Sequence, residues 1–338
     1  MGETGDKPVL RDWPEPDGGW DEKRARRLVW KTRIALWFSV LQMVLVVFFL
    51  YAVYAMVTQV VYGTMGMDTQ FVRYVTTLVE THHAGYRIDK LDDDDTTLSP
   101  LLTQETRLTL YKQIGEWGVV VGSVHATKRL FGDVRYEVNF QRKYLEEDGG
   151  FSFAVPPQLL GQPLPERKET ADMWEQWKHV DDGHVAELAF STREPMTPEK
   201  LLELLRPYNL KVLQMPVYAG ELQEFSISHA SAGGYAFVPH LVLRPAVQYR
   251  GRGMSIQDDL NHSVEAAKAQ LPADLEWLLA NGSYDGRDYD EKRLAYVKKN
   301  GITVYGAVVT GPIRELERLR QEKMFHSFQF GRIETWNW

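Results

Sequence analysis

The chain has 338 residues, of which 44% are hydrophobic and 25% charged, and its formal net charge is −7. This balance is typical of folded protein and excludes a chain that is disordered or fibrous throughout. The negative charge argues against direct binding of nucleic acid. Because there is no cysteine, disulfide frameworks and all cysteine-based metal or nucleophilic sites are excluded.

Residues 1–33 are predicted to form a short cytoplasmic tail. Its first part is broken by Pro8, Pro14, Pro16 and the pair Gly18-Gly19, a pattern typical of a disordered segment. Residues 20–33 contain neither Gly nor Pro and are expected to extend the helix that follows. A segment of this length is too small to bury a core of its own.

Residues 34–61 contain no Asp, Glu, Lys or Arg. About 20 consecutive apolar residues are enough to span a bilayer as a helix, so this run predicts a transmembrane helix. The apolar part of a cleaved signal peptide is only about 7–15 residues long. A retained anchor is therefore favoured over a cleaved signal and over a buried core helix.

The charges on either side of this run predict its orientation. In the twenty residues after Val61 the only basic residue is Arg73. Basic residues on cytoplasmic flanks set the topology of membrane proteins, so we expect the N-terminus in the cytoplasm and residues 62–338 outside the membrane. The basic residues that precede the run are Lys23, Arg24, Arg26, Arg27, Lys31 and Arg33.

Residues 62–183 are predicted to be a strand-rich juxtamembrane region that ends in a connector. A helix is expected near its start, within 66–90. Apolar and polar residues alternate between Thr106 and Phe140, which indicates strands. Residues 146–183 are rich in Gly, Pro and charge and are expected to form the connector, with a short helix at 171–180.

Residues 184–338 are predicted to form a second, α+β domain. A strand at 184–191 leads to a helix with Thr197 as its N-cap and Pro198 at its first position, and a strand at 210–217 completes a β-α-β unit. Two such units joined by helices predict an α+β fold of ferredoxin-like character. The further elements expected are a strand at 237–244, helices at 255–271 and 287–299, a strand at 302–309, a helix at 312–321, and a strand at 325–338 with a bulge at Gly331.

Few residue patterns indicate chemistry. The Asp92–Asp95 run lacks the spacing, Gly and distal Glu of a calcium loop, so a solvated loop is favoured. His82 and His83 would point about 100° apart on a helix, which favours surface or capping histidines over a metal site. No G-x-S-x-G motif occurs, and nothing assembles a nucleophile with a base. We therefore predict no enzyme activity, no catalytic residues, no metal and no cofactor.

The basic segment before the membrane run has two interpretations. Its charges hold the N-terminus inside and meet anionic lipid, which alone would explain them. In addition, Trp20, Arg24, Arg27 and Lys31 would share one face of a helix. This face is our candidate binding surface for a partner protein.

The C-terminal residues also resemble a known family. The segments HVAELAFSTREPMTPEKLLELL, NLKVLQMPVYAGE and VKKNGITVYGAVVTGPIRELERLR are similar to the C-terminal sigma-factor-regulator domain. The segment KTRIALWFSVLQMVLVVFFLY resembles the paired N-terminal regulator domain. Both domains occur in membrane anti-sigma factors of Gram-positive bacilli, and the most specific piece is NGITVYGAVVTGP at 300–312.

The resemblance implies a membrane-anchored regulator, of the anti-sigma type, of an extracytoplasmic-function sigma factor. The part outside would be sensory, and the tail would bind the sigma factor or a membrane relay protein. Members of the family with an anti-sigma role carry a larger cytoplasmic segment, so direct sequestration by 33 residues stays open, as does the oligomeric state. The alternative is an extracytoplasmic binding or scaffolding module of the cell envelope with no sigma-factor role.

Overall fold

The computed structural model describes residues 22–88, 96–129, 132–143, 146–147, 150–160, 171–232, 234–250, 253–256 and 259–336. It divides into two compact units, 1–61 and 62–338. The Asp92–Asp95 run and Trp20 lie outside the described residues.

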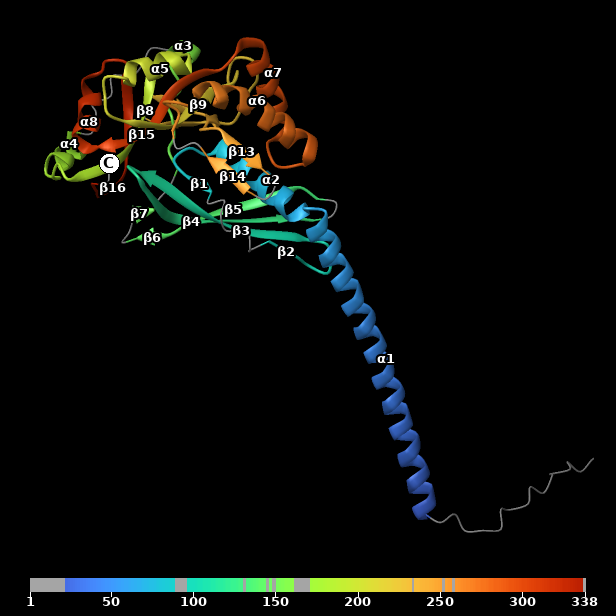
Figure 1. Cartoon of the computed structure of the whole chain (residues 1–338). Coiled ribbons are helices and arrows are strands. Elements are labelled where there is room, and N and C mark those ends of the chain that lie inside the picture. Colours follow the sequence, from blue (N-terminus) through green and yellow to red (C-terminus); the bar gives the residue numbers. More distant parts are fainter. Residues whose placement is uncertain are drawn as a thin grey trace, which may run out of the picture. The chain divides into compact units, whose positions relative to one another are not determined.

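The first unit holds most of a single long helix, α1 (Glu22–Thr64) (Figure 1). Among the described residues it is the one helix that is long and apolar enough to cross a membrane. Its large apolar side chains are exposed, for example Trp37 at 75% and Phe48 at 66%. A helix satisfies its own backbone hydrogen bonds, so lipid can cover this surface without cost to the polar groups. The helix predicted over 34–61 is confirmed, and so is its extension toward the N-terminus; that it crosses a membrane stays a prediction.

The second unit begins with α2 and a mainly antiparallel sheet, here called the N-terminal sheet. Strand β3 pairs with β1, β2 and β4, and β4 pairs with β5. Helix α2 packs on this sheet, because Val75 and Val79 share a core with Leu108, Leu110 and other strand residues. The elements are α2 (Met67–His82), β1 (Arg87–Ile88), β2 (Thr97–Leu98), β3 (Gln104–Ile114), β4 (Trp117–Lys128), β5 (Val134–Phe140), β6 (Arg142–Lys143), β7 (Glu146–Glu147), α3 (Pro157–Leu160) and α4 (Ala171–Lys178).

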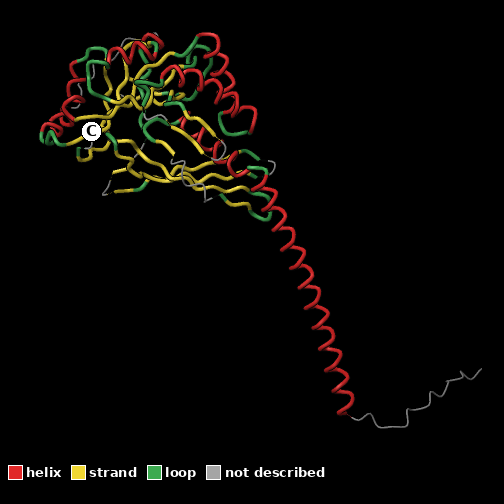
Figure 2. Tube along the Cα trace, viewed as in Figure 1, coloured by secondary structure: helices red, strands yellow, loops and turns green. Residues whose placement is uncertain are grey.

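The remaining elements form the five-stranded C-terminal sheet, two separate two-stranded sheets (β10 with β11, β13 with β14) and the helices around them. They are β8 (His184–Met196), α5 (Pro198–Leu205), β9 (Lys211–Tyr218), β10 (Ala230–Ala232), β11 (Tyr235–Phe237), β12 (Leu241–Leu243), β13 (Val247–Arg250), β14 (Gly253–Ile256), α6 (Val264–Asn281), α7 (Arg287–Asn300), β15 (Thr303–Pro312), α8 (Ile313–Arg318), the 3-10 helix η2 (Leu319–Gln321) and β16 (Phe325–Thr335). Figure 2 shows strands gathered in the 62–338 unit and none along α1.

The C-terminal sheet has the order β12-β9-β15-β8-β16, with all neighbours antiparallel. Strands β8 and β9, joined through α5, are therefore parallel with β15 between them. Strands β15 and β16, joined through α8, are parallel with β8 between them. Two interleaved β-α-β units make an α+β fold, as predicted. The ferredoxin-like description stays a prediction, since β12 adds a fifth strand and α6 and α7 lie between β9 and β15.

Local signals predicted most of these boundaries. Thr197 caps α5 by accepting a hydrogen bond from the Lys200 backbone N–H at 3.4 Å, and Pro198 occupies the first turn. Helix α7 ends at Gly301, whose φ of 78° is left-handed. The pairing of β16 with β8 shifts register between Phe330 and Ile333, which confirms the bulge at Gly331.

Two predicted elements are wrong in extent. The strand at 237–244 is interrupted: β11 ends at Phe237 and β12 starts at Leu241, with Pro239 between them offering no N–H for pairing. The helix at 255–271 begins only at Val264, because residues 253–256 pair as strand β14 with β13. The apolar spacing before Val264 mimicked a helical stripe, and Pro272 did not end the helix.

The C-terminal sheet is covered on both faces. One face carries the core formed with α5, α6 and α8, which includes Leu188, Leu201 and Leu275. The other face packs Ala189 and Tyr305 against the 84 and 151–153 segments. Strand β3 contacts β8, β15 and β16. Residues 62–338 are thus one compact unit, and a domain boundary at 183/184 stays a prediction.

Candidate functional site

Helix α2 is joined to the membrane helix by only two residues. Helix α1 ends at Thr64 and α2 starts at Met67, and Gly66 between them has a left-handed φ of 63°. Such a φ suits glycine and turns the chain sharply. Residues 62–64 of α1 already belong to the 62–338 unit, where Tyr62 is buried, and α2 is the next element along the chain.

The first contact of α2 is a buried ion-pair cluster. Glu80 of α2 accepts a hydrogen bond from the Arg244 guanidinium, just after β12, at 2.6 Å. The same guanidinium donates to Asp274 of α6 at 2.9 Å. All three side chains are buried, and Glu80 also accepts from the Ile88 backbone N–H at 3.0 Å. One arginine thus ties α2 to α6, and burial holds the pKa of Asp274 above its usual value despite Arg244.

The second contact is at the C-terminal end of α2. His82 Nε2 lies 2.9 Å from Asp290 Oδ2, on α7. Arg293 donates to Asp290 at 3.0 Å and to Glu221 at 2.8 Å, and Tyr284 Oη donates to Asp290 at 2.5 Å. Burial alone would raise the pKa of Asp290, but His82 and Arg293 outweigh it and lower that pKa to about 2.

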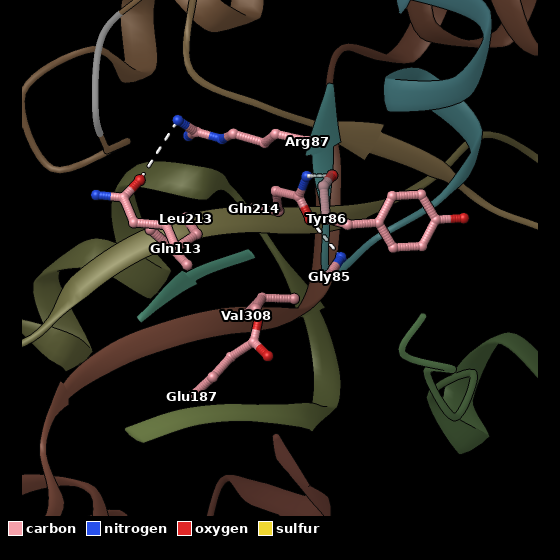
Figure 3. Close-up of a pocket in the computed structure, with 8 residues that line it drawn as sticks. All are labelled: Gly85, Tyr86, Arg87, Gln113, Glu187, Leu213, Gln214 and Val308. Atoms are coloured by element: carbon pink, nitrogen blue, oxygen red, sulfur yellow. Dashed lines mark hydrogen bonds between the residues drawn. The ribbon is translucent and has the colours of Figure 1, made fainter. Parts of the chain in front are cut away.

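The link from α2 to β1 is fixed to the C-terminal sheet by a glutamine. Gln214 of β9 accepts from the Gly85 N–H at 2.6 Å and donates to the Tyr86 carbonyl at 3.2 Å (Figure 3). The same place holds a small cavity between the sheets, with room for little more than about one water molecule. Glu187 of β8 lines it and pairs with buried Lys112 of β3 at 3.1 Å. The Gln214 hydrogen bonds and the Lys112–Glu187 ion pair hold the two sheets together here, and the cavity is too small for an organic ligand.

Three histidines of this unit are held in neutral form, His240 and His326 buried and His83 half-buried. Burial lowers the pKa of His83, His240 and His326 to about 4 each. The unfolded chain binds these protons near pH 6.5 and the folded chain does not, so stability is present above pH 6.5 and is lost as pH falls toward 4. We expect the free energy of unfolding to fall by several kcal/mol between pH 7 and pH 4. Urea denaturation of the full chain at a series of pH values measures this slope, and a flat profile over that range would show that these rings are not buried.

The sequence-predicted binding residues lie on α1. The side chains of Arg24, Arg27 and Lys31 are exposed, and a helical repeat of about 100° per residue places them within one narrow sector. Trp20, the fourth residue of this set, lies outside the described residues. That this face binds a partner stays a prediction.

The residues of the two contacts were not singled out from the sequence. The histidine pair was interpreted as surface or capping residues; His83 does follow the last turn of α2, but each ring has a distant partner, Asp290 for His82 and Tyr136 Oη at 2.8 Å for His83. Glu80 carried a usable signal, because it falls in phase with Val72 and Thr76 on the buried side of α2. A charge within an apolar stripe indicates a buried partner.

Comparison with known proteins shows which family the C-terminal part is similar to. Residues 178–332 match the family described as sigma factor regulator C-terminal. These residues, called the matched region below, are therefore similar to a sigma factor regulator domain. The chain is also 50% identical, over 48 residues, to "Probable anti-sigma-M factor YhdL" of Bacillus subtilis (strain 168). That match covers 14% of this chain and 13% of the relative. No solved structure matches the chain significantly.

The matched region contains the partners of α2. Among the described contacts of Glu80 and His82 with other parts of the chain, the charged groups are Arg244 and Asp290, and both lie within 178–332. The residues that extend these contacts, Glu221, Asp274 and Arg293, lie there as well. Helix α2, which follows the long apolar helix α1, is therefore ion-paired directly to the matched region.

Proposed function

We propose that this protein is a membrane-anchored regulator, of the anti-sigma type, of an extracytoplasmic-function sigma factor. The observation that carries the proposal is the pairing of Glu80 and His82, near the end of α2, with Arg244 and Asp290 of the matched region. Helix α2 follows the apolar helix α1 after one short turn. The matched family and the anti-sigma relative support the partner class. The basic flank before residue 34 supports a cytoplasmic N-terminus, with residues 62–338 outside.

In this mechanism the matched region is the sensor and α1 is the output. A signal that shifts the packing of α2 on α6 and α7 changes the force that α2 exerts on α1. Alternatively, it changes the exposure of α1 to a protease or partner in the membrane. The segment 22–33 then binds or releases a sigma factor, or a relay protein that holds one. A buried, ion-paired contact suits this role because it has two discrete states, formed and broken, rather than a continuous range.

The experiment that tests the partner surface is a charge reversal on one face of α1. The triple variant R24E/R27E/K31E should lose co-purification of the full chain with a sigma factor identified by mass spectrometry. The matched control K23E/R26E/R33E makes the same charge change on other sides of the helix and should retain most of it.

Equal loss in both triples would mean that lipid or topology, not a binding face, explains the charges. A reporter enzyme fused after residue 336 should be active only outside the membrane in both triples, which verifies that orientation is unchanged. If neither the full-length chain nor the control variant co-purifies with a sigma factor or relay protein, the result favours the alternative, an envelope binding or scaffolding module.

A further inference from the structure

The ring of His82 is surrounded in a way that requires two protons. Its Nδ1 lies 2.7 Å from the Leu78 carbonyl oxygen, which only accepts. Its Nε2 lies 2.9 Å from the Asp290 carboxylate, which also accepts. The nearby Thr81 hydroxyl donates its own proton to the Thr77 carbonyl at 2.7 Å and so offers His82 a lone pair. A neutral imidazole donates from one nitrogen only, so these partners are all satisfied by the imidazolium form.

Charge balance gives the same answer. With His82 protonated, the buried group of His82, Arg293, Asp290 and Glu221 carries two positive and two negative charges. Without that proton the group has a net negative charge among side chains that are almost entirely buried, and Nε2 turns a lone pair toward a carboxylate. The last turn of a helix also favours a cation, and His82 occupies that position in α2.

Other titratable and charged groups also surround the His82 ring. Among the described residues, the titratable and charged groups facing this region are Tyr74 and His83 from α2 and its C-cap, Tyr136 of β5, Glu221 after β9, His240 before β12, Tyr284 and Asp285 before α7, and Arg287, Asp290 and Arg293 of α7. Burial keeps the pKa of His83 and His240 near 4 and raises that of Tyr284, so these three side chains stay neutral from pH 6.5 to 9. The His82 side chain is 18% exposed, so water can exchange its proton.

We propose that His82 and Asp290 form a pH-sensitive latch that holds the C-terminal end of α2 on α7 when His82 is protonated and releases it when the proton is lost. The inference rests on the proposed function for its meaning, since residues 62–338 outside the membrane would experience external pH. Acid would close the latch and alkali would open it. The change at α2 would then reach α1 through the turn at Gly66.

Hydrogen exchange of the full chain in lipid nanodiscs tests the latch. After correction for intrinsic exchange, amide protection in the last turns of α2 should fall about ten- to hundredfold from pH 6.5 to 9, the range that a hydrogen bond to a charged group supports. In His82→Gln, which keeps one donor but cannot titrate, protection should be the same at both pH values. The matched control His184→Gln, at the start of β8, should retain the wild-type pH dependence.

A second measurement covers the case in which the variant is poorly folded. In wild-type chain labelled with ¹⁵N-histidine, both ring nitrogens of His82 should show the protonated form at pH 6.5. Its loss of the proton should have the same midpoint as the fall in α2 protection. A neutral His82 ring at pH 6.5, or an unchanged pH dependence in His82→Gln, would overturn the latch. Neither measurement involves a sigma factor, so the latch can fail while the proposed function stands, and the reverse.

Discussion

Replacing Arg244 by alanine should lower the free energy of unfolding by about 3–5 kcal/mol. Arg244 is the shared partner of Glu80 and Asp274, and the side chains of all three are less than a tenth exposed. Its loss leaves two buried carboxylates that face each other without this cation, and removing one partner of a buried ion pair typically costs that much. Urea denaturation of the full chain in detergent, followed by tryptophan fluorescence, measures the change.

Two further variants show whether charge is the cause. Lys298→Ala removes an ion pair with Glu276 in which both side chains are about half exposed, and should cost less than about 1 kcal/mol. In the triple variant E80Q/R244M/D274N the charges are removed together, and much of the lost stability should return. A loss below about 1.5 kcal/mol in Arg244→Ala would mean that water reaches the cluster and that α2 is not held there.

Lys112→Met is expected to be destabilising to a similar extent, about 3–5 kcal/mol. The Lys112 ammonium lies 3.1 Å from Glu187, and the two side chains are 3% and 1% exposed between the sheets. Methionine keeps an unbranched apolar stem of similar length but leaves the Glu187 carboxylate without this cation. Thermal and urea denaturation should both show the loss.

A double-mutant cycle separates this ion pair from packing effects. The variant K112M/E187Q should be more stable than K112M alone, because the glutamine carries no charge to bury. Lys211→Met serves as the control, since Lys211 pairs at 2.6 Å with the half-exposed Glu116 at the surface. If K112M and the Lys211 variant are equally stable, the two sheets are not joined through the buried pair.

The parts of the fold that sequence predicted well are those with a local physical cause. The charge-free run at 34–61 forms part of α1, and the Thr197 cap with Pro198 marks the start of α5. Strands β3 to β5 follow from strict alternation, which a half-buried sheet requires. Each of these signals lies within a few residues of the element it predicts.

What sequence missed depends on contacts between distant residues. Strand β14 exists because residues 253–256 pair with β13, which overrides the helical spacing of Ile256 and Leu260. The pairs Glu80 with Arg244 and His82 with Asp290 join residues separated by 164 and 208 positions. No periodicity within a segment reports such a partner. For the same reason His82 was predicted to be an ordinary surface or capping histidine, although it lies against a buried carboxylate.

The roles of the two ends of the molecule follow from different kinds of observation. The regulatory role proposed for residues 178–332 is supported by their family match, and their link to α2 by two ion pairs. The output through the start of α1 rests on exposed basic residues on one helical face, Arg24, Arg27 and Lys31. Regulation depends on the proposed output through the start of α1, because a sensor that lacks a cytoplasmic contact has no route to transcription.

The most direct test of the account is therefore transcription from a promoter of the sigma factor that co-purifies with the full chain, measured in cells that carry a chain lacking residues 2–30. This deletion keeps Lys31 and Arg33 to hold the orientation, and leaves residues 34–338 intact. The account predicts that transcription rises to the level seen in cells without the protein, while the shortened chain remains in the membrane with residue 336 outside. Transcription that stays at the level of the full-length chain would contradict it.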